Sequence, residues 1–465
     1  MIGDTRPPAA GSTGPGRVAV IGGGLSGSEA AWQAAQLGAE VTLYEMRPAR
    51  MTEAHKTALL AELVCSNSFK SESLDNANGL LKLELKMLGS LLVDAAARAR
   101  VPAGMALCVD RQAFSADVTR AIEADPRITV VRREAEGLPE AGVTVLAPGP
   151  LASPSISSAI EGLVGARHLF FYDAVSPIVE ADSIDMAKAF NSSRYDKGES
   201  TYLNLPLDRA QYLSFLGELR SADVLPRRDF EEDKFFSACM PIEESARMGD
   251  ETLAHGCMKP VGLIDPRTGR MPYAVVQLRP ENVAGTMYGM VGFQTRLKYG
   301  EQERILRMLP GLEGARFIRL GSIHRNTYIC GPAVLLPSLQ HKRLPQVLMA
   351  GQVTGAEGYM AAVATGLLAG INAGRAVRGD AILVPPAETV IGGLARYVSQ
   401  ASPLDFKPLN PSYGLVPPLG ARVRDRRRRN LLLSERSVRS LKSWIERNGL
   451  PGRTDMVVNP SGVVS

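Results

Sequence analysis

The chain has 465 residues, of which 45% are hydrophobic and 22% charged, and a formal net charge of +5. This composition indicates a globular protein of two or three domains. No uncharged apolar run reaches the about 18 residues of a membrane span. Residues 1–16 have the Pro, Gly and Ser content of a flexible tail and lack the apolar segment of a secretory signal. We therefore expect a cytoplasmic protein that is not bound to a membrane.

The first predicted elements follow the order of a dinucleotide-binding unit. A β-branched strand at 18–21 enters a glycine-rich turn, an Ala-rich helix comes next, and a second strand at 41–44 ends in an acid. The glycines fit G-x-G-x-x-G, in which the first permits the turn, the second admits a pyrophosphate and the third lets helix and strand pack closely. The pyrophosphate would lie on the helix N-terminus and the acid would bind a ribose; the alternative is a purely structural glycine turn. The predicted cofactor-binding residues are Gly22, Gly23, Gly24, Leu25, Ser26, Gly27 and Glu45.

Residues 56–100 are predicted to be mostly helical, with Asn78 as the N-cap of an apolar-periodic helix. Its leucines at helical spacing are predicted to be core: Leu81, Leu85, Leu88 and Leu92. Strands are predicted at 127–131 and 143–147. The second runs into a turn at Gly149, of the kind that borders a cofactor in doubly wound sheets.

The residue composition of the chain changes between about residues 175 and 340. Polar, aromatic and Pro-rich segments alternate there, with candidate strands at 273–278 and 286–293, which favours an inserted α+β domain. Near its end, His324 stands beside Arg325 and Asn326. This polar cluster would either bind a substrate anion or hold a loop.

Residues 346–375 repeat the opening pattern of a strand, a Gly-rich turn and a long helix of small residues. The small residues could simply allow close helix packing. The segment also resembles the late strand–glycine–helix unit of flavoproteins, whose helix N-terminus faces the flavin. A dinucleotide fold that begins at one end of the chain and closes at the other favours FAD over NAD. The residues predicted to bind the cofactor here are Gly351, Gln352, Gly358 and Tyr359.

The predicted fold class is therefore α/β, a Rossmann-like FAD-binding domain interrupted by an α+β insertion domain. The expected divisions are a tail at 1–16, the two parts of the FAD-binding domain at 17–185 and 326–448, an insertion domain at 186–325, and a C-terminal tail at 449–465. Within the second part, 376–420 is expected to be loop-like and 422–448 a basic amphipathic helix. Its arginines suit a polyanion such as nucleic acid, or else form a solvated helix face. They include Arg422, Arg426, Arg427, Arg428 and Arg429.

The five cysteines and five histidines are dispersed, without a CxxC pair or histidines at metal-ligand spacing. We therefore expect neither a disulfide framework nor a metal site. Cys65 lies among polar residues in AELVCSNSFKSES, where cations would lower the pKa of a thiol. Cys239 lies in FFSACMPIEESA. Each of the two would otherwise be a buried small residue, and Cys108 is predicted to be core.

At these motifs the sequence resembles the folate- and FAD-dependent tRNA (uracil-5-)-methyltransferases, the TrmFO family. The resemblance runs from residue 17 to about 448, and AELVCSNSF and CMPIE are its most specific motifs. It also includes VPAGMALCVDR, MKPVGLIDPRTG, HRNTY and GQVTGAEGYMAAVATGLLAGINA. The glycine loop and the last segment are shared with the larger GidA/MnmG flavoproteins.

The resemblance implies methylation of carbon 5 of a T-loop uridine in tRNA. The methyl carbon would come from 5,10-methylenetetrahydrofolate, and FADH₂, regenerated by NADH or NADPH, would supply the reducing electrons. The family's two functional cysteines map to Cys65 and Cys239. We favour Cys239 as the thiol that attacks uracil and Cys65 as a supporting thiol, although sequence alone does not decide between them. His55 and Lys56 are expected to contact RNA near the pocket, and the protein is expected to be a monomer or a weak oligomer.

The sequence departs from the family pattern at several positions: Pro148, Ala152, Leu205, Cys257, Ala361 and Ala362. Ala361 and Ala362 lie at the predicted flavin loop, where they are expected to change individual contacts with the cofactor but not the fold. Two alternatives remain, a FAD/NAD(P)H oxidoreductase acting on a small molecule and a non-catalytic, flavin-stabilised tRNA-binding protein. A GidA/MnmG-type modification is disfavoured because too few residues follow the last flavin motif for that family's helical C-terminal domain.

Overall fold

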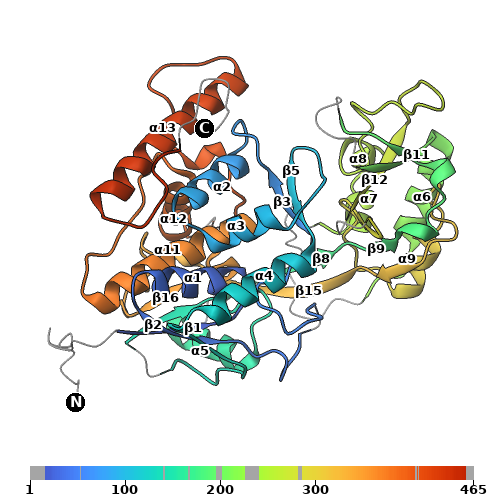
Figure 1. Cartoon of the computed structure of the whole chain (residues 1–465). Coiled ribbons are helices and arrows are strands. Elements are labelled where there is room, and N and C mark those ends of the chain that lie inside the picture. Colours follow the sequence, from blue (N-terminus) through green and yellow to red (C-terminus); the bar gives the residue numbers. More distant parts are fainter. Residues whose placement is uncertain are drawn as a thin grey trace.

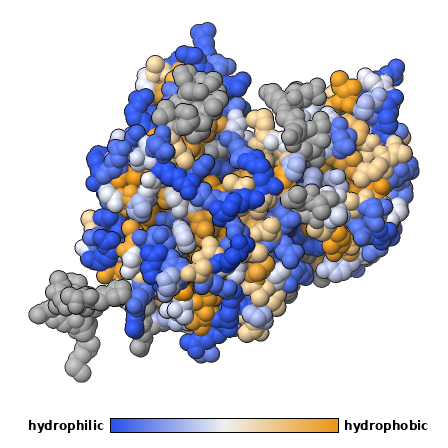
Figure 2. Space-filling view, in the orientation of Figure 1, coloured by the Kyte–Doolittle hydropathy of each residue, from blue (hydrophilic) through white to orange (hydrophobic). Residues whose placement is uncertain are grey.

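The structure is a computed structural model of the whole chain. Its described residues are 16–52, 54–139, 142–165, 168–194, 202–225, 240–280, 285–403, 406 and 408–456. For 168–175 and 322–327 the description covers the backbone. Within these residues the chain forms two bodies, seen as separate groups of elements in Figure 1 and as two lobes in Figure 2.

The larger body is built on a parallel sheet, as predicted. Its strands, in the order β16-β7-β1-β2-β6, are all parallel to their neighbours in the described register. Because side chains alternate across a strand, Val18 and Val20 pack into the main core while Ile21 packs into a smaller core on the other face. The strand bounds are β1 Arg17–Ile21, β2 Glu40–Tyr44, β6 Ile128–Val131, β7 Val143–Leu146 and β16 Val347–Met349.

Two helices of small residues pack against each other over this sheet (Figure 1). They are α1 (Leu25–Gln36) and α11 (Tyr359–Arg378). A Cβ atom on Gly366 would lie 2.3 Å from the Ser26 carbonyl oxygen, and one on Gly370 would lie 2.4 Å from the Ala30 carbonyl oxygen. The small residues therefore allow the two backbones to touch. By length and composition α11 could span a membrane, but 78% of its apolar window is buried inside the protein.

The remaining helices of this body include α5 on the opposite face of the sheet and α13 beside α2 and α12 (Figure 1). The predicted continuous helix from residue 78 is wrong in two respects: Asn76 is the N-cap, accepting from the Asn78 N–H, and the helix is broken before Ser90, which caps α3. The predicted leucines are nevertheless buried. The loop predicted at 376–420 is also wrong in part, since it contains α12. The bounds are α2 Ala77–Met87, α3 Leu91–Arg98, α4 Arg111–Ala124, α5 Pro154–Val164, α10 Gly331–Val334, α12 Val390–Gln400 and α13 Arg426–Arg447. A small sheet is formed by β3 Ser68–Ser71, β4 Arg100–Val101 and β5 Ala106–Val109.

The smaller body confirms the predicted α+β insertion. Its described strands form one antiparallel sheet in the order β10-β11-β12-β13-β9-β14, with its own hydrophobic core. The strands are β9 Ile178–Glu180, β10 Phe190–Asn191, β11 Leu203–Leu207, β12 Ala274–Pro280, β13 Met287–Met290 and β14 Phe317–Arg319. The helices are α6 Arg209–Ser221, α7 Ile242–Arg247, α8 Thr252–His255 and α9 Tyr299–Leu306.

An antiparallel ribbon of two strands joins the two bodies. It consists of β8 (His168–Val175) and β15 (Ser322–Ile329). Since β9 already belongs to the second sheet, we propose that the insertion begins before β9 instead of at residue 186.

Candidate active site

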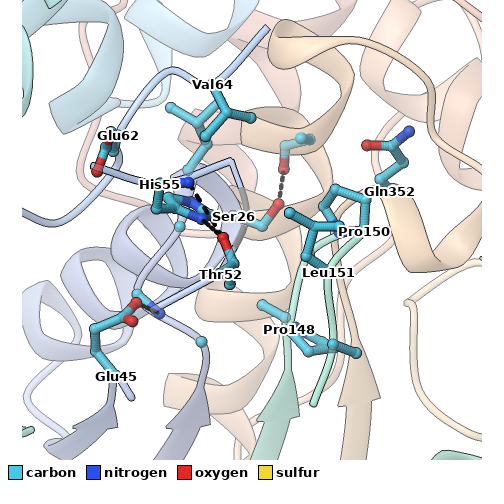
Figure 3. Close-up of a pocket in the computed structure, with 18 of the residues that line it drawn as sticks. Ser26, Glu45, Thr52, His55, Glu62, Val64, Pro148, Pro150, Leu151 and Gln352 are labelled. Carbon is cyan, nitrogen blue, oxygen red and sulfur yellow. Dashed lines mark hydrogen bonds between the residues drawn. The ribbon is translucent and has the colours of Figure 1, made fainter. Parts of the chain in front are cut away.

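A cavity opens at the carboxyl ends of the central parallel strands, where doubly wound folds bind their ligands. It encloses about 1730 Å³ of empty space, its open mouth included. Figure 3 shows Glu45, Thr52 and His55 on one side of Ser26, and Pro148, Pro150 and Leu151 on the other. Most of the predicted pocket residues line it: Gly22, Gly23, Gly24, Leu25, Ser26, Glu45, His55, Cys65, Gly149, Gln352, Gly358 and Tyr359.

The three glycines of the first loop have different surroundings. Gly22 has a φ of +100°, and a Cβ on it would lie 2.3 Å from the Ala147 carbonyl oxygen. A Cβ on Gly27 would lie 1.7 Å from the Gly22 carbonyl oxygen, so this glycine allows the helix to meet the turn. A Cβ on Gly24 would meet no described atom within 4 Å. Gly24 thus faces open space in the cavity, while Gly27 supports the loop from behind.

Two helix N-termini open into the cavity. Gly24 is the N-cap of α1 and Gly358 the N-cap of α11, and neither helix has a side-chain cap among the described residues. Their first N–H groups are therefore available to an anionic ligand. Gly351 is not among the residues that line the cavity, and a Cβ on it would come 2.5 Å from the Ser26 Oγ. Ser26 in turn donates to the Ala362 carbonyl oxygen at 2.9 Å. The arrangement fits a dinucleotide with its pyrophosphate at α1 and its far end at α11.

Glu45 is buried and already engaged by the protein. It accepts hydrogen bonds from the Gly23 N–H at 3.0 Å and from the Arg47 N–H and Nε at 2.9 Å each. Burial alone would raise the pKa of Glu45, but the hydrogen bonds and charge of Arg47 outweigh it and lower the pKa. Glu45 is therefore an ionised carboxylate that fixes the glycine loop, and its contact with a ribose remains a prediction.

Cys65 lies in the cavity wall, next to the first residue of α11. The Tyr359 hydroxyl oxygen accepts hydrogen bonds from the backbone N–H groups of Cys65, at 2.8 Å, and Ser66, at 3.0 Å. Cys65 is half-buried and forms no disulfide with a described cysteine. Burial, together with the nearby Cys65 thiol group, raises the pKa of the Tyr359 hydroxyl. Tyr359 thus stays protonated and holds the cysteine loop against the predicted flavin end.

Of the two predicted RNA contacts near the pocket, one lines it. The His55 Nδ1 lies 2.6 Å from the Thr52 hydroxyl inside the cavity. Lys56 is exposed and lies outside the lining residues, and its backbone N–H donates to Glu62. The arginines predicted to bind RNA are likewise exposed and outside the cavity: Arg426–Arg429 begin α13, and Arg422 lies in the segment before it, where a helix was predicted from residue 422.

Several lining residues were not predicted, chiefly Lys70, Gln294 and Asn410. The Lys70 Nζ donates to the Asn410 Oδ1 at 2.5 Å, although 340 residues separate them. Lys70 lies in the same motif as Cys65, AELVCSNSFKSES, so its place in the sequence could have indicated that it lines the cavity. Gln294 and Asn410 lie in stretches without periodicity, and nothing in their local sequence marks them.

Two predicted residues cannot be placed. Cys239 lies outside the described residues, and the description of His324 covers its backbone in β15. The end of the CMPIE motif is described, however. The Ile242 N–H donates to the Gln294 carbonyl oxygen at 2.8 Å, and Gln294 lines the cavity.

The departures from the family pattern fall in different places. Pro148, Ala152 and Ala362 line the cavity, whereas Ala361 and Leu205 are fully buried. Cys257 is packed against Gly292, and burial raises the pKa of its thiol to about 11. At neutral pH Cys257 is therefore a protonated thiol.

Comparison with known proteins shows the family to which the chain belongs. The family model described as glucose inhibited division protein A matches residues 17–381. Over 428 residues, 92% of this chain and 97% of the relative, the sequence is 51% identical to the methylenetetrahydrofolate–tRNA-(uracil-5-)-methyltransferase TrmFO of Moorella thermoacetica. It is also 51% identical to the TrmFO of Aquifex aeolicus, over 93% of this chain and 97% of that one.

Among solved structures, Aquifex aeolicus GidA in crystal form I has a TM-score of 0.66 at 16% identity, covering 93% of this chain and 79% of that chain. Crystal form II of the same protein has a TM-score of 0.63, covering 83% and 67%. These structures establish the shared fold.

Proposed function

Because the chain belongs to the glucose inhibited division protein A family, and within it to the TrmFO proteins, we infer that it is a methylenetetrahydrofolate–tRNA-(uracil-5-)-methyltransferase. Identity of about half of the residues over nearly the whole length supports this function and neither of the alternatives, a small-molecule oxidoreductase or a non-catalytic RNA-binding protein. In the structure, one observation carries the proposal: Cys65 shares a cavity with the glycine loop and both uncapped helix ends.

The reaction explains why a thiol and a flavin site belong together. Carbon 5 of uracil is a weak nucleophile, and addition of a thiolate to carbon 6 converts the ring to an enolate that can attack the folate methylene. Loss of the carbon 5 proton and release of tetrahydrofolate leave an exocyclic methylene. Reduced FAD, when bound, supplies the hydride that converts this methylene to a methyl group. Expulsion of the thiolate from carbon 6 then restores the uracil ring.

We assign the two thiols to this chemistry as proposals. The position of Cys65 beside Tyr359 supports a role next to the flavin end of the cavity. The hydrogen bond from the Ile242 N–H to the Gln294 carbonyl oxygen brings the described end of the CMPIE motif to a residue that lines the cavity, which supports a role for Cys239. Cys239 is our candidate for the thiol that attacks uracil, and Cys65 for the supporting thiol.

The N-terminus of α13 supports the proposed RNA surface. Four exposed arginines, Arg426–Arg429, occupy the first turn of a helix of 22 residues. Cations at a helix N-terminus oppose the helix dipole, at a cost of about 0.3–1 kcal/mol each. A purely structural helix would place acids there, so the run favours binding to a polyanion. The Arg427 Nε lies 3.9 Å from the Asp75 Oδ2, in the segment that joins the cavity-lining Lys70 to α2. This contact supports an RNA-binding face that runs from the arginines toward that segment.

We propose that tRNA lies across this face and inserts a T-loop uridine into the cavity, after it has left its stack. Phosphate contacts from Arg422 and Arg426–Arg429 would dominate the affinity, and His55 would lie near the inserted base. NADH or NADPH would reduce the flavin by transient binding. The protein would act in the cytoplasm as a monomer or a weak oligomer.

The direct test uses the purified yellow protein with unmodified tRNA, carbon-labelled methylenetetrahydrofolate and NADPH. We expect label in 5-methyluridine, and we expect Cys65→Ala and Cys239→Ala each to abolish it. Cys330→Ala is the control, because Cys330 is half-buried and is not among the residues that line the cavity. Transfer of label from S-adenosylmethionine instead of the folate would contradict the function. Full activity of either cysteine variant would remove that thiol from the chemistry.

A further inference from the structure

The backbone carbonyls of the Cys65 loop are held by two arginines that come from different bodies. Arg111, the first residue of α4, donates to the Leu63 carbonyl oxygen at 2.8 Å and to the Cys65 carbonyl oxygen at 3.5 Å. Arg319, the last residue of β14 in the insertion sheet, donates to the Val64 carbonyl oxygen at 2.9 Å and to the Cys65 carbonyl oxygen at 3.2 Å. The Cys65 carbonyl oxygen therefore accepts hydrogen bonds from both bodies.

Arg319 makes one more contact that defines its role. It donates to the Ser176 carbonyl oxygen at 3.2 Å, in the link between β8 and β9. One guanidinium thus joins the cysteine loop, the connection between the bodies and the insertion sheet. We propose that Arg319 is a positioning residue for methyl transfer: it docks the insertion sheet onto the Cys65 loop and so sets the place and reactivity of the thiol. This inference rests on the proposed role of Cys65 in the reaction.

A second anchor holds the same loop on the other side of the cysteine. Asn67 is fully buried, and its Oδ1 accepts from the Arg279 Nε at 2.7 Å. Its Nδ2 donates to the Pro280 carbonyl oxygen at 2.9 Å and to the Val109 carbonyl oxygen at 3.0 Å. Arg279 and Pro280 belong to β12 of the insertion sheet. The insertion sheet therefore contacts the loop on both sides of Cys65.

The peptide groups of Cys65 are fixed in both directions. Its N–H donates to the Tyr359 hydroxyl on the cofactor side, while its carbonyl accepts from Arg111 and Arg319. A thiol carried by a loop reacts efficiently only if the loop holds it near the reacting atom, and displacements of about 1 Å are costly. Three side chains supply that restraint: Tyr359 from the cavity wall, and Arg111 and Arg319 from outside the lining residues.

The choice of arginine has a chemical consequence. A guanidinium offers donors in a rigid planar fork and keeps its charge at every accessible pH. Two such charges on the carbonyl of Cys65 favour the thiolate form of the same residue. The other titratable groups that line the cavity with this thiol are Tyr44, Glu45, Arg47, His55, Glu62, Lys70, Arg133, Glu134, Glu357 and Tyr359. Of the two arginines on the Cys65 carbonyl, Arg319 is the one that comes from the insertion sheet.

The test measures the reactivity of Cys65 directly. FAD-loaded full-length protein is alkylated with iodoacetamide over a range of pH, and the rate at the Cys65 peptide is followed by mass spectrometry. We expect Arg319→Gln to raise the pH midpoint of alkylation by about one unit, the lower end of the effect of a nearby charge. Arg319→Lys, which keeps the charge but loses the fork, is expected to shift the midpoint less and to lower kcat with little change in the KM for tRNA.

The matched control is Arg316→Gln. Arg316 is an exposed arginine three residues away, paired with Glu180 and Asp182 at 2.6 Å each, outside the cysteine loop. We expect the pH midpoint of Cys65 alkylation and the kcat of Arg316→Gln to equal those of the unaltered protein. An unchanged Cys65 midpoint in Arg319→Gln that retains its flavin, or an equal shift in Arg316→Gln, would overturn the proposal. If Arg319→Gln does not fold, unchanged kcat in Arg319→Lys overturns it. Alkylation requires neither tRNA nor folate, so failure of the methyltransferase function would leave this measurement intact.

Discussion

The two walls of the cavity are held in place by different kinds of contact. On the glycine wall, backbone meets backbone: an atom added to Gly27 or Gly366 would lie 1.7 or 2.3 Å from a carbonyl oxygen. On the Cys65 wall, peptide groups are held at hydrogen-bond distance by the side chains of Tyr359, Arg111 and Arg319. The first wall should tolerate no added volume, whereas the second should depend on single polar atoms and charges. The glycine wall is therefore held together by close backbone packing and the Cys65 wall by hydrogen bonding.

The largest expected effect comes from adding one methyl group to the glycine wall. Gly27→Ala requires the helix and the turn to separate, and overpacking of this kind costs about 1–3 kcal/mol or more. We expect protein that unfolds at a lower temperature and is purified without flavin. Flavin absorbance and a thermal unfolding curve of the purified protein measure both effects.

Gly24→Ala is the matched control for that experiment. The added methyl group would meet no described atom of the protein within 4 Å, so the apoprotein should keep its unfolding midpoint. It would still occupy the space predicted for the pyrophosphate, and flavin affinity should fall. Equal stability of the Gly27→Ala and unaltered proteins would show that the glycine wall is less closely packed than the structure indicates.

The same contrast explains what could be predicted from sequence. The glycine loop at 22–27 could be predicted because strand, turn and helix follow one another in one short segment, although Gly22 also approaches Ala147 and Gly366 approaches Ser26 across the fold. The Cys65 wall depends on pairs that are far apart in the chain, such as Cys65 with Tyr359, 294 residues away, and with Arg319, 254 residues away. Nothing in the neighbourhood of Arg319 reveals such a partner. The break between α2 and α3 was missed for a different reason, because the leucine spacing continues across Ser90 although its side chain caps a new helix.

The next largest effect is expected on the Cys65 wall. Tyr359→Phe removes the acceptor of two backbone N–H groups, and each buried donor left unsatisfied costs about 1–3 kcal/mol. We expect kcat for methyl transfer to fall about 10- to 100-fold, the equivalent of a misplaced thiol. Flavin should remain bound, since the N-terminus of α11 is unaltered. Steady-state kinetics and the flavin content of the purified variant measure the two quantities separately.

The control for Tyr359→Phe is Tyr299→Phe, because Tyr299 is 62% exposed on the insertion body. A loss of flavin that parallels the loss of activity in Tyr359→Phe would contradict the division between a cofactor wall and a thiol wall.

Outside the cavity, charge can be removed without loss of packing. Replacing Arg426–Arg429 with glutamine should weaken tRNA binding and reduce the slope of log affinity against log salt by roughly 0.9 for each phosphate that the protein no longer neutralises. Folding stability should be unchanged or slightly higher, because the helix dipole disfavours cations at this end.

Binding of tRNA to the Arg426–Arg429 variant is measured at several salt concentrations. The comparison is a variant with the same number of exposed arginines replaced elsewhere: Arg98, Arg120, Arg304 and Arg316. An equal loss of affinity in both variants would refute a binding surface at α13.

The last prediction is a dependence of stability on pH, and it arises where α13 is attached. The buried Glu84 of α2 accepts from the N–H groups of Val390 and Ile391 at 2.8 and 2.9 Å and from the Ser437 hydroxyl at 2.6 Å. This single carboxylate holds α12 and α13 on α2. Burial raises its pKa from 4.5 to about 7, and the three hydrogen bonds oppose that shift without cancelling it.

The sign of the pH effect follows from this raised pKa. Between about pH 4.5 and 7 the folded protein holds a proton on Glu84 that the unfolded chain releases. The stability that this proton contributes is complete below pH 4.5 and is lost as the pH rises through 7, so the free energy of unfolding should decline across that window.

Glu84→Gln removes the titration, and a plot of its free energy of unfolding against pH should lack this decline. Glu446→Gln, at an exposed position of α13, should keep it. Denaturant unfolding at several pH values distinguishes the variants, and an identical slope in Glu84→Gln would mean that the carboxylate is ionised throughout and serves only as a cap. In that case the contribution of the α13 attachment to folding stability, like that of the glycine wall, would not change with pH across this window.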